Sequence, residues 1–153
     1  MFRREAAGKD EGSMAKVSRL EHITLYAHDV RRLTAFYEAA LELKGTEAPG
    51  EDGTAGLAIE PTSGRRELII MNNPHHMHLA FCADSLTDFK AVWSKLKELG
   101  IFIQGPYWQQ EGPTFSFFDP EGNHVQIIWP VRAAWPAGRK VTFEQLEEWA
   151  DRT

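Results

Sequence analysis

The first clear pattern of hydrophobic and polar positions begins at Leu20. From there to Ala27, apolar side chains fall on both faces of an alternating segment, which predicts a strand buried on both sides. Asp29 then stands where a helix N-cap belongs, and apolar residues follow it at intervals of three and four. Those apolar residues are Val30, Leu33, Phe36, Tyr37, Ala40 and Leu41. The segment therefore predicts a strand followed by an amphipathic helix.

The chain contains an internal repeat. A shift of 56 residues places the segment HITL, which begins at His22, on the segment HLAF, which begins at His78. The same shift matches the apolar positions of the two helical segments that follow. Towards the ends of the two halves, a shift of 59 residues places Glu67 on Gln126. Each half therefore predicts a strand, a helix and then about three strands.

The later strands are better marked in the second half than in the first. Residues 113–118 and 124–129 are apolar runs joined by Asp-Pro-Glu-Gly-Asn, a strong turn sequence, and residues 101–103 form a third run. The first half offers residues 57–60 and 67–71. We expect an α+β fold in which two paired βαβββ modules form a cupped mixed sheet, with a helix added at the C-terminus.

These patterns divide the chain into three parts. Residues 1–17 mix charges with glycine and alanine and predict a flexible N-terminal tail. Residues 18–130 are expected to form the domain, with modules at about 18–73 and 74–130. Residues 131–153 are a C-terminal extension with a helix.

The C-terminal extension carries a helix start signal. Thr142 suits the N-cap position, and Gln145, three residues later, suits the capping-box partner. One face of this helix is apolar and consists of Phe143, Leu146, Trp149 and Ala150. Such a face needs a surface to cover, either the outside of the sheet or a second subunit.

Composition narrows the classes of function. The 153 residues are 42% hydrophobic and 25% charged, which suits one compact domain. A net charge of -5, with 17 basic and 22 acidic residues, argues against nucleic-acid binding, because that needs a basic face. No apolar run approaches the roughly 18 to 20 residues of a membrane span. Cys82 is the only cysteine and no signal segment opens the chain, so a reducing cytoplasm is the expected location.

His22 and His78 are the strongest candidates for chemistry among the six histidines, because the repeat superposes them. Equivalent strand positions in two paired modules would place both side chains on one concave face. A metal site there needs a third ligand. Imidazole together with an amide or carboxylate oxygen suits Mn, Fe, Ni, Co or Zn. His75 and His76 fall in the link between the modules and are expected to be linker residues.

Three segments resemble the vicinal oxygen chelate superfamily, which includes glyoxalase I, fosfomycin-resistance thiol transferases, extradiol ring-cleaving dioxygenases and bleomycin-binding proteins. They are LEHITLYAHDVRRLTAFYEAAL, HMHLAFCADSLTDFKAVWSKLKELGI and FFDPEGNHVQI. The resemblance covers about residues 20–129. It is carried by the histidine of the opening strand, the HxAF strand of the second module and the DPxGN turn before the last strand.

The resemblance implies a metal site. In metal-dependent members the ligands are the two strand histidines and a glutamate after the DPxGN turn, which correspond here to His22, His78 and Gln126. The glutamine departs from the pattern, because an amide oxygen supplies less charge to a cation than a carboxylate does. Glu67 lies, by the shift of 59, where such members place a fourth ligand. It is otherwise a solvated edge residue beside two arginines. His124 shares the strand face of Gln126 and either takes part in the site or points outward at the turn.

The resemblance also bears on the reaction. Ring-cleaving members have a tyrosine where this chain has Ser116, and an acid/base histidine where it has Tyr107 and Trp108. Fosfomycin transferases need basic residues, and residues 104–129 contain no Lys or Arg. Glyoxalase-type isomerisation needs only a metal that polarises an oxygen and a group that moves a proton. Tyr107 and Trp108 follow a Gly-Pro pair and are expected in a loop that forms a pocket wall for substrate.

The leading hypothesis is a metal-dependent enzyme of the glyoxalase and dioxygenase type, acting on a small, apolar or aromatic, oxygen-chelating substrate. The alternative is a metal-free protein of the bleomycin-resistance type that binds a drug or metabolite. The pair of His22 and His78 favours the enzyme, and Gln126 favours the binding protein. Because many members pair modules between two chains, we also expect a homodimer, in which the C-terminal helix contacts the partner or covers its own sheet.

Overall fold

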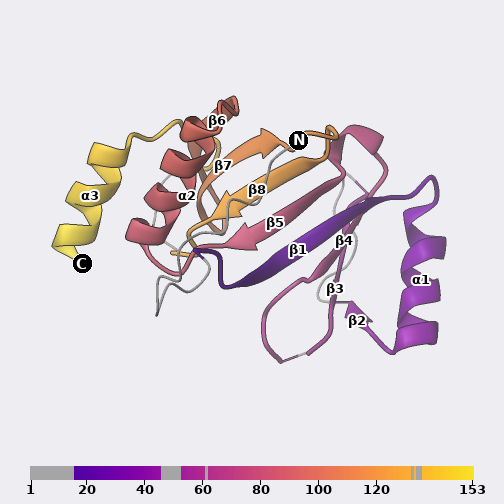
Figure 1. Ribbon diagram of the computed structural model, residues 1–153. Coiled ribbons are helices and arrows are strands. Elements are labelled where there is room, and N and C mark those ends of the chain that lie inside the picture. The colour runs from indigo at the N-terminus through magenta and orange to yellow at the C-terminus, as the bar shows by residue number, and fades with distance from the viewer. Residues whose placement is uncertain (1–15, 46–52, 61, 132, 134–135) are drawn as a thin grey trace, which may run out of the picture.

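The computed structural model describes residues 16–45, 53–60, 62–131, 133 and 136–153. An eight-stranded mixed sheet organises the molecule, and three α-helices and one short 3-10 helix accompany it (Figure 1). The strands are β1 (Arg19–Tyr26), β2 (Lys44–Gly45), β3 (Ala55–Ala58), β4 (Leu68–Met71), β5 (His78–Cys82), β6 (Ile103–Gln109), β7 (Gly112–Phe118) and β8 (His124–Ile128). The helices are α1 (Val30–Leu41), η1 (Pro74–His76), α2 (Leu86–Glu98) and α3 (Phe143–Arg152). The α+β fold is confirmed. The predicted N-terminal tail lies outside the described residues except for residues 16 and 17.

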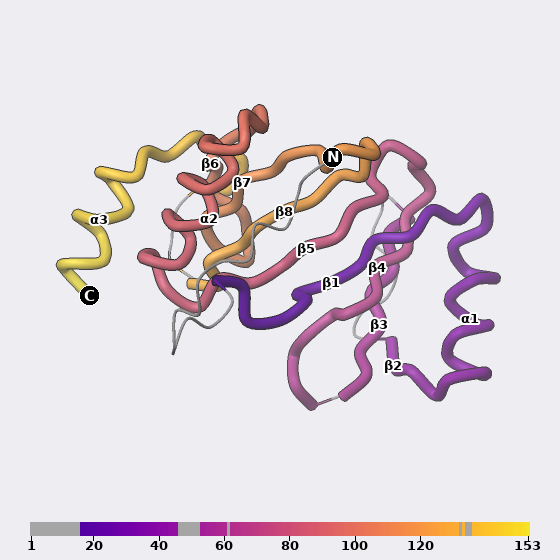
Figure 2. The backbone as a smooth tube through the Cα atoms, viewed as in Figure 1, coloured from indigo at the N-terminus to yellow at the C-terminus, as the bar shows by residue number. Residues whose placement is uncertain are grey.

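The strand order is symmetric about the centre of the sheet. It runs β2-β3-β4-β1-β5-β8-β7-β6, so that β1 and β5 meet in the middle as an antiparallel pair. Each of these two strands is flanked by the last strand of its own module in parallel, β4 beside β1 and β8 beside β5 (Figure 2). The two βαβββ modules expected from the repeat therefore join edge to edge through their first strands.

The strand register corrects one part of the repeat. Thr24 on β1 pairs with Ile69, and Ala80 on β5 pairs with Gln126. Because Thr24 and Ala80 are equivalent at the shift of 56, the first-module equivalent of Gln126 is Ile69, and the shift at the last strands is 57 rather than 59. A two-residue change keeps every side chain on the same face, so the alternating pattern could not distinguish Glu67 from Ile69.

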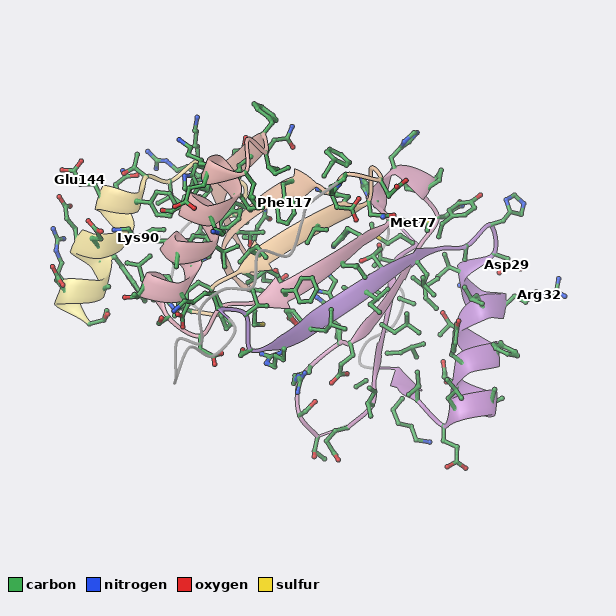
Figure 3. All side chains as sticks on the ribbon, in the orientation of Figure 1. Asp29, Arg32, Met77, Lys90, Phe117 and Glu144 are labelled. Atoms are coloured by element: carbon green, nitrogen blue, oxygen red, sulfur yellow. The ribbon has the colours of Figure 1, made fainter. Side chains whose placement is uncertain are left out.

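The predicted caps are confirmed. Asp29 is the N-cap of α1 and its side chain accepts a hydrogen bond from the backbone N–H of Arg32 at 3.0 Å (Figure 3). Thr142 and Gln145 form the capping box of α3. Asp119 holds the turn before β8 by accepting the backbone N–H of Asn123 at 2.8 Å. Local hydrogen bonds of short polar side chains therefore fix these three boundaries.

The apolar face of α3 covers its own module. Leu146 is fully buried. The ring of Phe143 lies 5.0 Å from that of Trp93 on α2, and the ring of Trp149 lies 5.8 Å from that of Trp129, just after β8. The apolar face of α3 is therefore covered by the chain's own second module, and it needs no second subunit.

The two ends of the sheet are covered unequally. Lys90 of α2 forms an ion pair with Glu147 of α3, so two helices stand together at this end (Figure 3). At the other end α1 stands alone among the described helices, and its side chains Phe36 and Leu41 are 59% and 61% exposed. None of the described helices is long and apolar enough to cross a membrane.

Strand β6 is longer than expected. The sequence predicted residues 101–103 as a strand and the segment after them as a loop, but β6 continues to Gln109. Its pairing with β7 is interrupted between Gln104 and Tyr107, where Gly105 has a φ of 107°. A glycine and a proline that favour a loop here form an irregularity inside a strand instead, which is where such residues are tolerated in sheets.

Candidate functional site

A cavity of about 600 Å³ opens on the face of the sheet that carries the two strand histidines. His22 pairs with Ala80, and Ala80 pairs with Gln126 on its other side. His78 pairs with Thr24, two residues along the same strands. Directly opposed residues project to the same face of a sheet. The strands β1, β5 and β8 therefore bring His22, His78 and Gln126 to one cavity.

The two histidine rings meet across the boundary between the modules. The Nε2 atoms of His22 and His78 lie 2.8 Å apart, and the ring planes are nearly perpendicular at 82°. Two ring nitrogens at this separation must share one hydrogen, with one donating and the other accepting, or turn their lone pairs towards a common cation. With both lone pairs turned inwards, the two nitrogens could bind one metal ion together.

A backbone contact fixes the tautomer of His78. Its Nδ1 lies 2.6 Å from the carbonyl oxygen of His76, and a carbonyl oxygen only accepts, so Nδ1–H is the donor. The lone pair of the neutral ring is then on Nε2, the atom that faces His22. Metal-binding histidines commonly donate their second N–H to a carbonyl or carboxylate in this way.

Both rings are held neutral. Burial, followed by the nearby His78 and Arg66, lowers the pKa of His22 to about 4. Burial is also the main cause that lowers the pKa of His78. A neutral imidazole is the form that binds a metal ion, so the two histidines are ready to act as ligands at neutral pH.

Among the described residues no carboxylate is grouped with the two histidines, although Glu111 lines the cavity. Within the described part of the chain, no three His, Cys, Asp or Glu side chains are grouped as a metal centre would require. The third donor on the same sheet face is the amide of Gln126, which is half-buried between Ala80 and Ser116 in the pairing. Two imidazoles and one amide oxygen fit a divalent transition metal, although without a carboxylate to offset its charge.

Glu67 does not line the cavity that holds both histidines. Its carboxylate accepts the backbone N–H of Ile59 at 3.1 Å and lies 3.5 Å from Nε of Arg65. It lines a mostly apolar cavity of about 510 Å³, which His22 also lines, whereas Ile69 lines the cavity that His22 and His78 share. The prediction of Glu67 as a fourth ligand rested on the shift that the register corrects.

Tyr107 and Trp108 belong to β6 rather than to a loop. Trp108 is only 2% exposed, and its ring packs 6.2 Å from that of Trp149 on α3. Its large apolar ring is therefore part of the core of the second module, not a pocket wall. Tyr107 is 37% exposed and pairs with Thr114, which lines the histidine cavity. A substrate contact by Tyr107 stays a prediction.

Three further histidines line the cavity. His75 and His76 lie in η1, within the link between the modules as expected, but they also line the cavity, and the carbonyl of His76 orients His78. His124 stacks on Phe118 with ring centres 5.0 Å apart, and its Nε2 is buried without a hydrogen-bond partner among the described residues. The spacing of two residues between His76 and His78 was the signal for their shared location.

Comparisons with known proteins agree with this geometry. The model of the Glyoxalase/Bleomycin resistance protein/Dioxygenase superfamily matches residues 19–127. A search of curated protein sequences found no match.

Solved structures with a similar fold include the Mn(II)-bound glyoxalase from Novosphingobium aromaticivorans, with 17% identity and a TM-score of 0.63 over 84% of this chain and 43% of that one. Homoprotocatechuate 2,3-dioxygenase from Brevibacterium fuscum, in complex with 3,4-dihydroxyphenylacetate, has 18% identity and a TM-score of 0.60 over 91% and 42%. A catechol 2,3-dioxygenase has 17% identity and a TM-score of 0.64 over 86% and 48%. The chain spans less than half the length of each of these neighbours, and at these identities the likeness shows the fold alone.

The family match covers well over half of the chain and includes both strand histidines and Gln126. The symmetric sheet and the paired modules are those expected for it. The chain belongs to the Glyoxalase/Bleomycin resistance protein/Dioxygenase superfamily.

Proposed function

We propose that this protein is a metal-dependent enzyme of the glyoxalase and dioxygenase type, acting on a small oxygen-chelating substrate. The observation that carries the proposal is the meeting of His22 and His78, whose Nε2 atoms face each other at 2.8 Å inside a cavity. Burying two imidazoles is costly because each ring gives up hydrogen bonds to water, and a cation shared between the two nitrogens would offset this cost.

The proposed metal ligands are His22, His78 and Gln126. The metal would be a divalent ion such as Mn, Fe, Ni, Co or Zn, which imidazole and amide donors suit. Bound there, it would polarise a substrate oxygen and stabilise the negative charge that develops on it. The names of the structural neighbours include an Mn(II)-bound glyoxalase and ring-cleaving dioxygenases, which supports a metal of this class.

Residues of the chain itself shape the substrate site. The carbonyl of His76 keeps Nε2 of His78 available for the ligand. Apolar side chains of Ile69, Met71 and Ile128 line the cavity and reduce the access of water. A low-dielectric wall of this kind strengthens the electrostatic effect of any donor in the cavity.

A metal-free binding protein of the bleomycin-resistance type is the second candidate. The observation that favours it is that, among the described residues, no third His, Cys, Asp or Glu completes a metal-binding group with the two histidines. In this case the same cavity holds a drug or metabolite by hydrogen bonds to the imidazole and amide groups.

Metal loading separates the two candidates. The protein is incubated in turn with Mn, Fe, Ni, Co and Zn, freed of excess ion, and its metal content is measured. We expect about one ion per chain in the wild type and a strong loss in His78→Ala. His28→Ala is the control, because His28 is exposed and outside the cavity. Failure of the wild type to retain any of the five metals would favour the binding protein.

The homodimer and the cytoplasmic location stay predictions. Both modules that form the cavity come from one chain, and α3 covers its own module, so the site as described is complete in a monomer. The argument for a dimer therefore rests on the family relation alone. Light scattering at micromolar concentration measures the oligomeric state, and twice the mass of 17.4 kDa is expected.

A further inference from the structure

A small polar cavity of about 150 Å³ adjoins the histidine cavity. The two share His22, Ile69, Gln110 and Glu111 as lining residues, so a ligand that reaches one can extend into the other. The walls of the small cavity are mostly polar, whereas the histidine cavity has apolar walls beside β4 and β8.

Three arginines line this polar cavity. Arg19 comes from β1, and Arg65 and Arg66 come from the segment just before β4. Two carboxylates oppose them there, Glu21 and Glu111. The lining residues themselves therefore carry one more positive than negative charge, while Glu67, outside this lining, lies 3.5 Å from Nε of Arg65.

Arg66 and Arg19 are only loosely paired with the two carboxylates of this cavity. Nη2 of Arg66 lies 3.8 Å from Oε1 of Glu111, and Nη1 of Arg19 lies 3.9 Å from Oε2 of Glu21. Both distances exceed a hydrogen bond. The side chains of Arg66 and Glu111 are 33% and 31% exposed, and ion pairs of this kind contribute only about 0 to 1 kcal/mol. A ligand that offers better geometry can replace Glu111 as the partner of Arg66.

Arg66 is the best placed of the three for a ligand that also reaches the histidines. It lines the polar cavity together with His22. Its partner Glu111 lies on the turn between β6 and β7, in the opposite module. The guanidinium presents a planar fork of N–H donors that matches the two oxygens of a carboxylate.

We propose that the polar cavity binds a carboxylate of the substrate, with Arg66 as its main partner, so that the substrate is a small acid with chelating oxygens at its other end. The inference rests on the proposed function for the position of the chelating end. It also adds an acidic group to the apolar or aromatic substrate expected from the sequence. This group would be bound by Arg66 of the first module.

A matched pair of probes tests this proposal. The first probe is 3,4-dihydroxybenzoate and the second is 3,4-dihydroxybenzamide, which has the same shape and hydroxyl groups but no charge. Benzoate, which has the carboxylate without the hydroxyls, is the third. Binding to protein incubated with Zn²⁺, a redox-inactive ion, is followed by calorimetry and by NMR chemical shifts. Each probe is titrated into the wild type, Arg66→Gln, Arg66→Lys and Glu111→Gln, with Arg152→Gln on α3 as the charge control.

We expect the wild type to bind 3,4-dihydroxybenzoate at least about tenfold more tightly than 3,4-dihydroxybenzamide, as a charge-assisted bidentate contact implies. Arg66→Gln should remove this preference, Arg66→Lys should retain part of it, and Arg152→Gln should leave it intact. Glu111→Gln should strengthen it, because the competing carboxylate is gone. This last variant keeps the test valid if Arg66→Gln fails to fold.

The two proposals fail in different ways. If 3,4-dihydroxybenzoate and 3,4-dihydroxybenzamide bind equally well, and Arg66→Gln changes neither affinity, the carboxylate site is overturned. The chelating site is not affected by this result. If neither dihydroxy probe binds, the proposed function is overturned, and benzoate alone decides the polar cavity. Benzoate shifts at the polar cavity that depend on Arg66 support it, and their absence overturns it.

Discussion

Ile69 occupies, beside Thr24 on β1, the register position that Gln126 occupies beside Ala80 on β5. The two modules are therefore unequal where they meet, because the last strand of one offers an apolar side chain and that of the other offers an amide. The donors of the histidine cavity come from β1, β5 and β8, and β4 contributes only a wall.

Replacing the amide by a carboxylate should strengthen metal binding. Gln126→Glu adds a full negative charge at the same position, and a charged oxygen ligand outweighs an amide oxygen for divalent ions. We expect the affinity for Mn²⁺ or Zn²⁺ to rise by about tenfold or more, since charge-assisted contacts are worth roughly 1.5 to 3 kcal/mol. Calorimetric titration measures it.

Gln109→Glu is the matched control for this substitution. Gln109 also lines the histidine cavity, but at the end of β6, so the variant adds the same charge away from the three donors. A comparable gain in both variants would mean that the field of the cavity, and not ligation by residue 126, attracts the metal.

The sequence predicted those features that depend on local spacing. The histidine pair followed from two identical strand positions 56 residues apart, and the N-cap Asp29 and the capping box of Thr142 and Gln145 followed from contacts of three residues. The capping signals lie within a turn of helix, where the chain dictates its own geometry, whereas the distant histidine contact was predicted because the internal repeat superposes the two residues.

Features that depend on distant pairing escaped the sequence. The choice between Glu67 and Ile69 depends on the register of β4 against β1, and alternation alone is blind to a shift of two. The place of Arg66 beside Glu111 depends on two segments from different modules meeting at the cavity. No periodicity in either segment indicates that contact, so the proposed carboxylate site could not be inferred from the sequence.

Helix α3 should contribute strongly to the stability of the second module. Leu146→Ala removes a fully buried side chain from among the aromatic rings of this module, and such cavities cost about 2 to 5 kcal/mol. Chemical denaturation measures the loss. The exposed neighbour Glu148→Ala should change the free energy of unfolding by no more than about 0.5 kcal/mol. Equal effects of the two would contradict the packing described for α3.

The turn before β8 should make stability depend on pH. Hydrogen bonds from the side chain and then the backbone of Asn123, with others from Glu121 and Gly122, lower the pKa of Asp119. A carboxyl with a lower pKa in the folded state stabilises the fold above its unfolded pKa, and this stability is lost as the pH falls through the folded pKa. The melting temperature of Asp119→Ala should therefore lie below that of the wild type at pH 7, with the gap closing towards pH 3.

Asp151→Ala is the control for the pH experiment, because it removes an exposed carboxylate from the last turn of α3. It should lack the gap that closes with falling pH. If the melting temperatures of the wild type and Asp119→Ala stayed parallel from pH 7 to pH 3, the hydrogen bonds to the Asp119 carboxylate would not be stabilising the turn.

Gly112 should tolerate no side chain, and its replacement should also affect ligand binding at the proposed substrate site. Its φ is 140°, and an added Cβ would overlap the carbonyl oxygen of Trp129 and lie 2.9 Å from the backbone N of Val131. Gly122 also has a positive φ, 83°, but has open space around it. We expect Gly122→Ala to cost about 1 kcal/mol from backbone strain alone. Gly112→Ala should cost on the order of 3 kcal/mol, because strain and overlap add.

The two glycine variants also differ in where the strain falls. Gly112 directly follows Glu111 on the turn that faces Arg66, so a backbone shift at this glycine moves the counter-ion of the polar cavity. Gly112→Ala should therefore change the preference for 3,4-dihydroxybenzoate over its amide, whereas Gly122→Ala should leave it unchanged. Calorimetry on folded protein at low temperature measures both. A preserved preference in Gly112→Ala would mean that the position of Glu111 does not control access to Arg66.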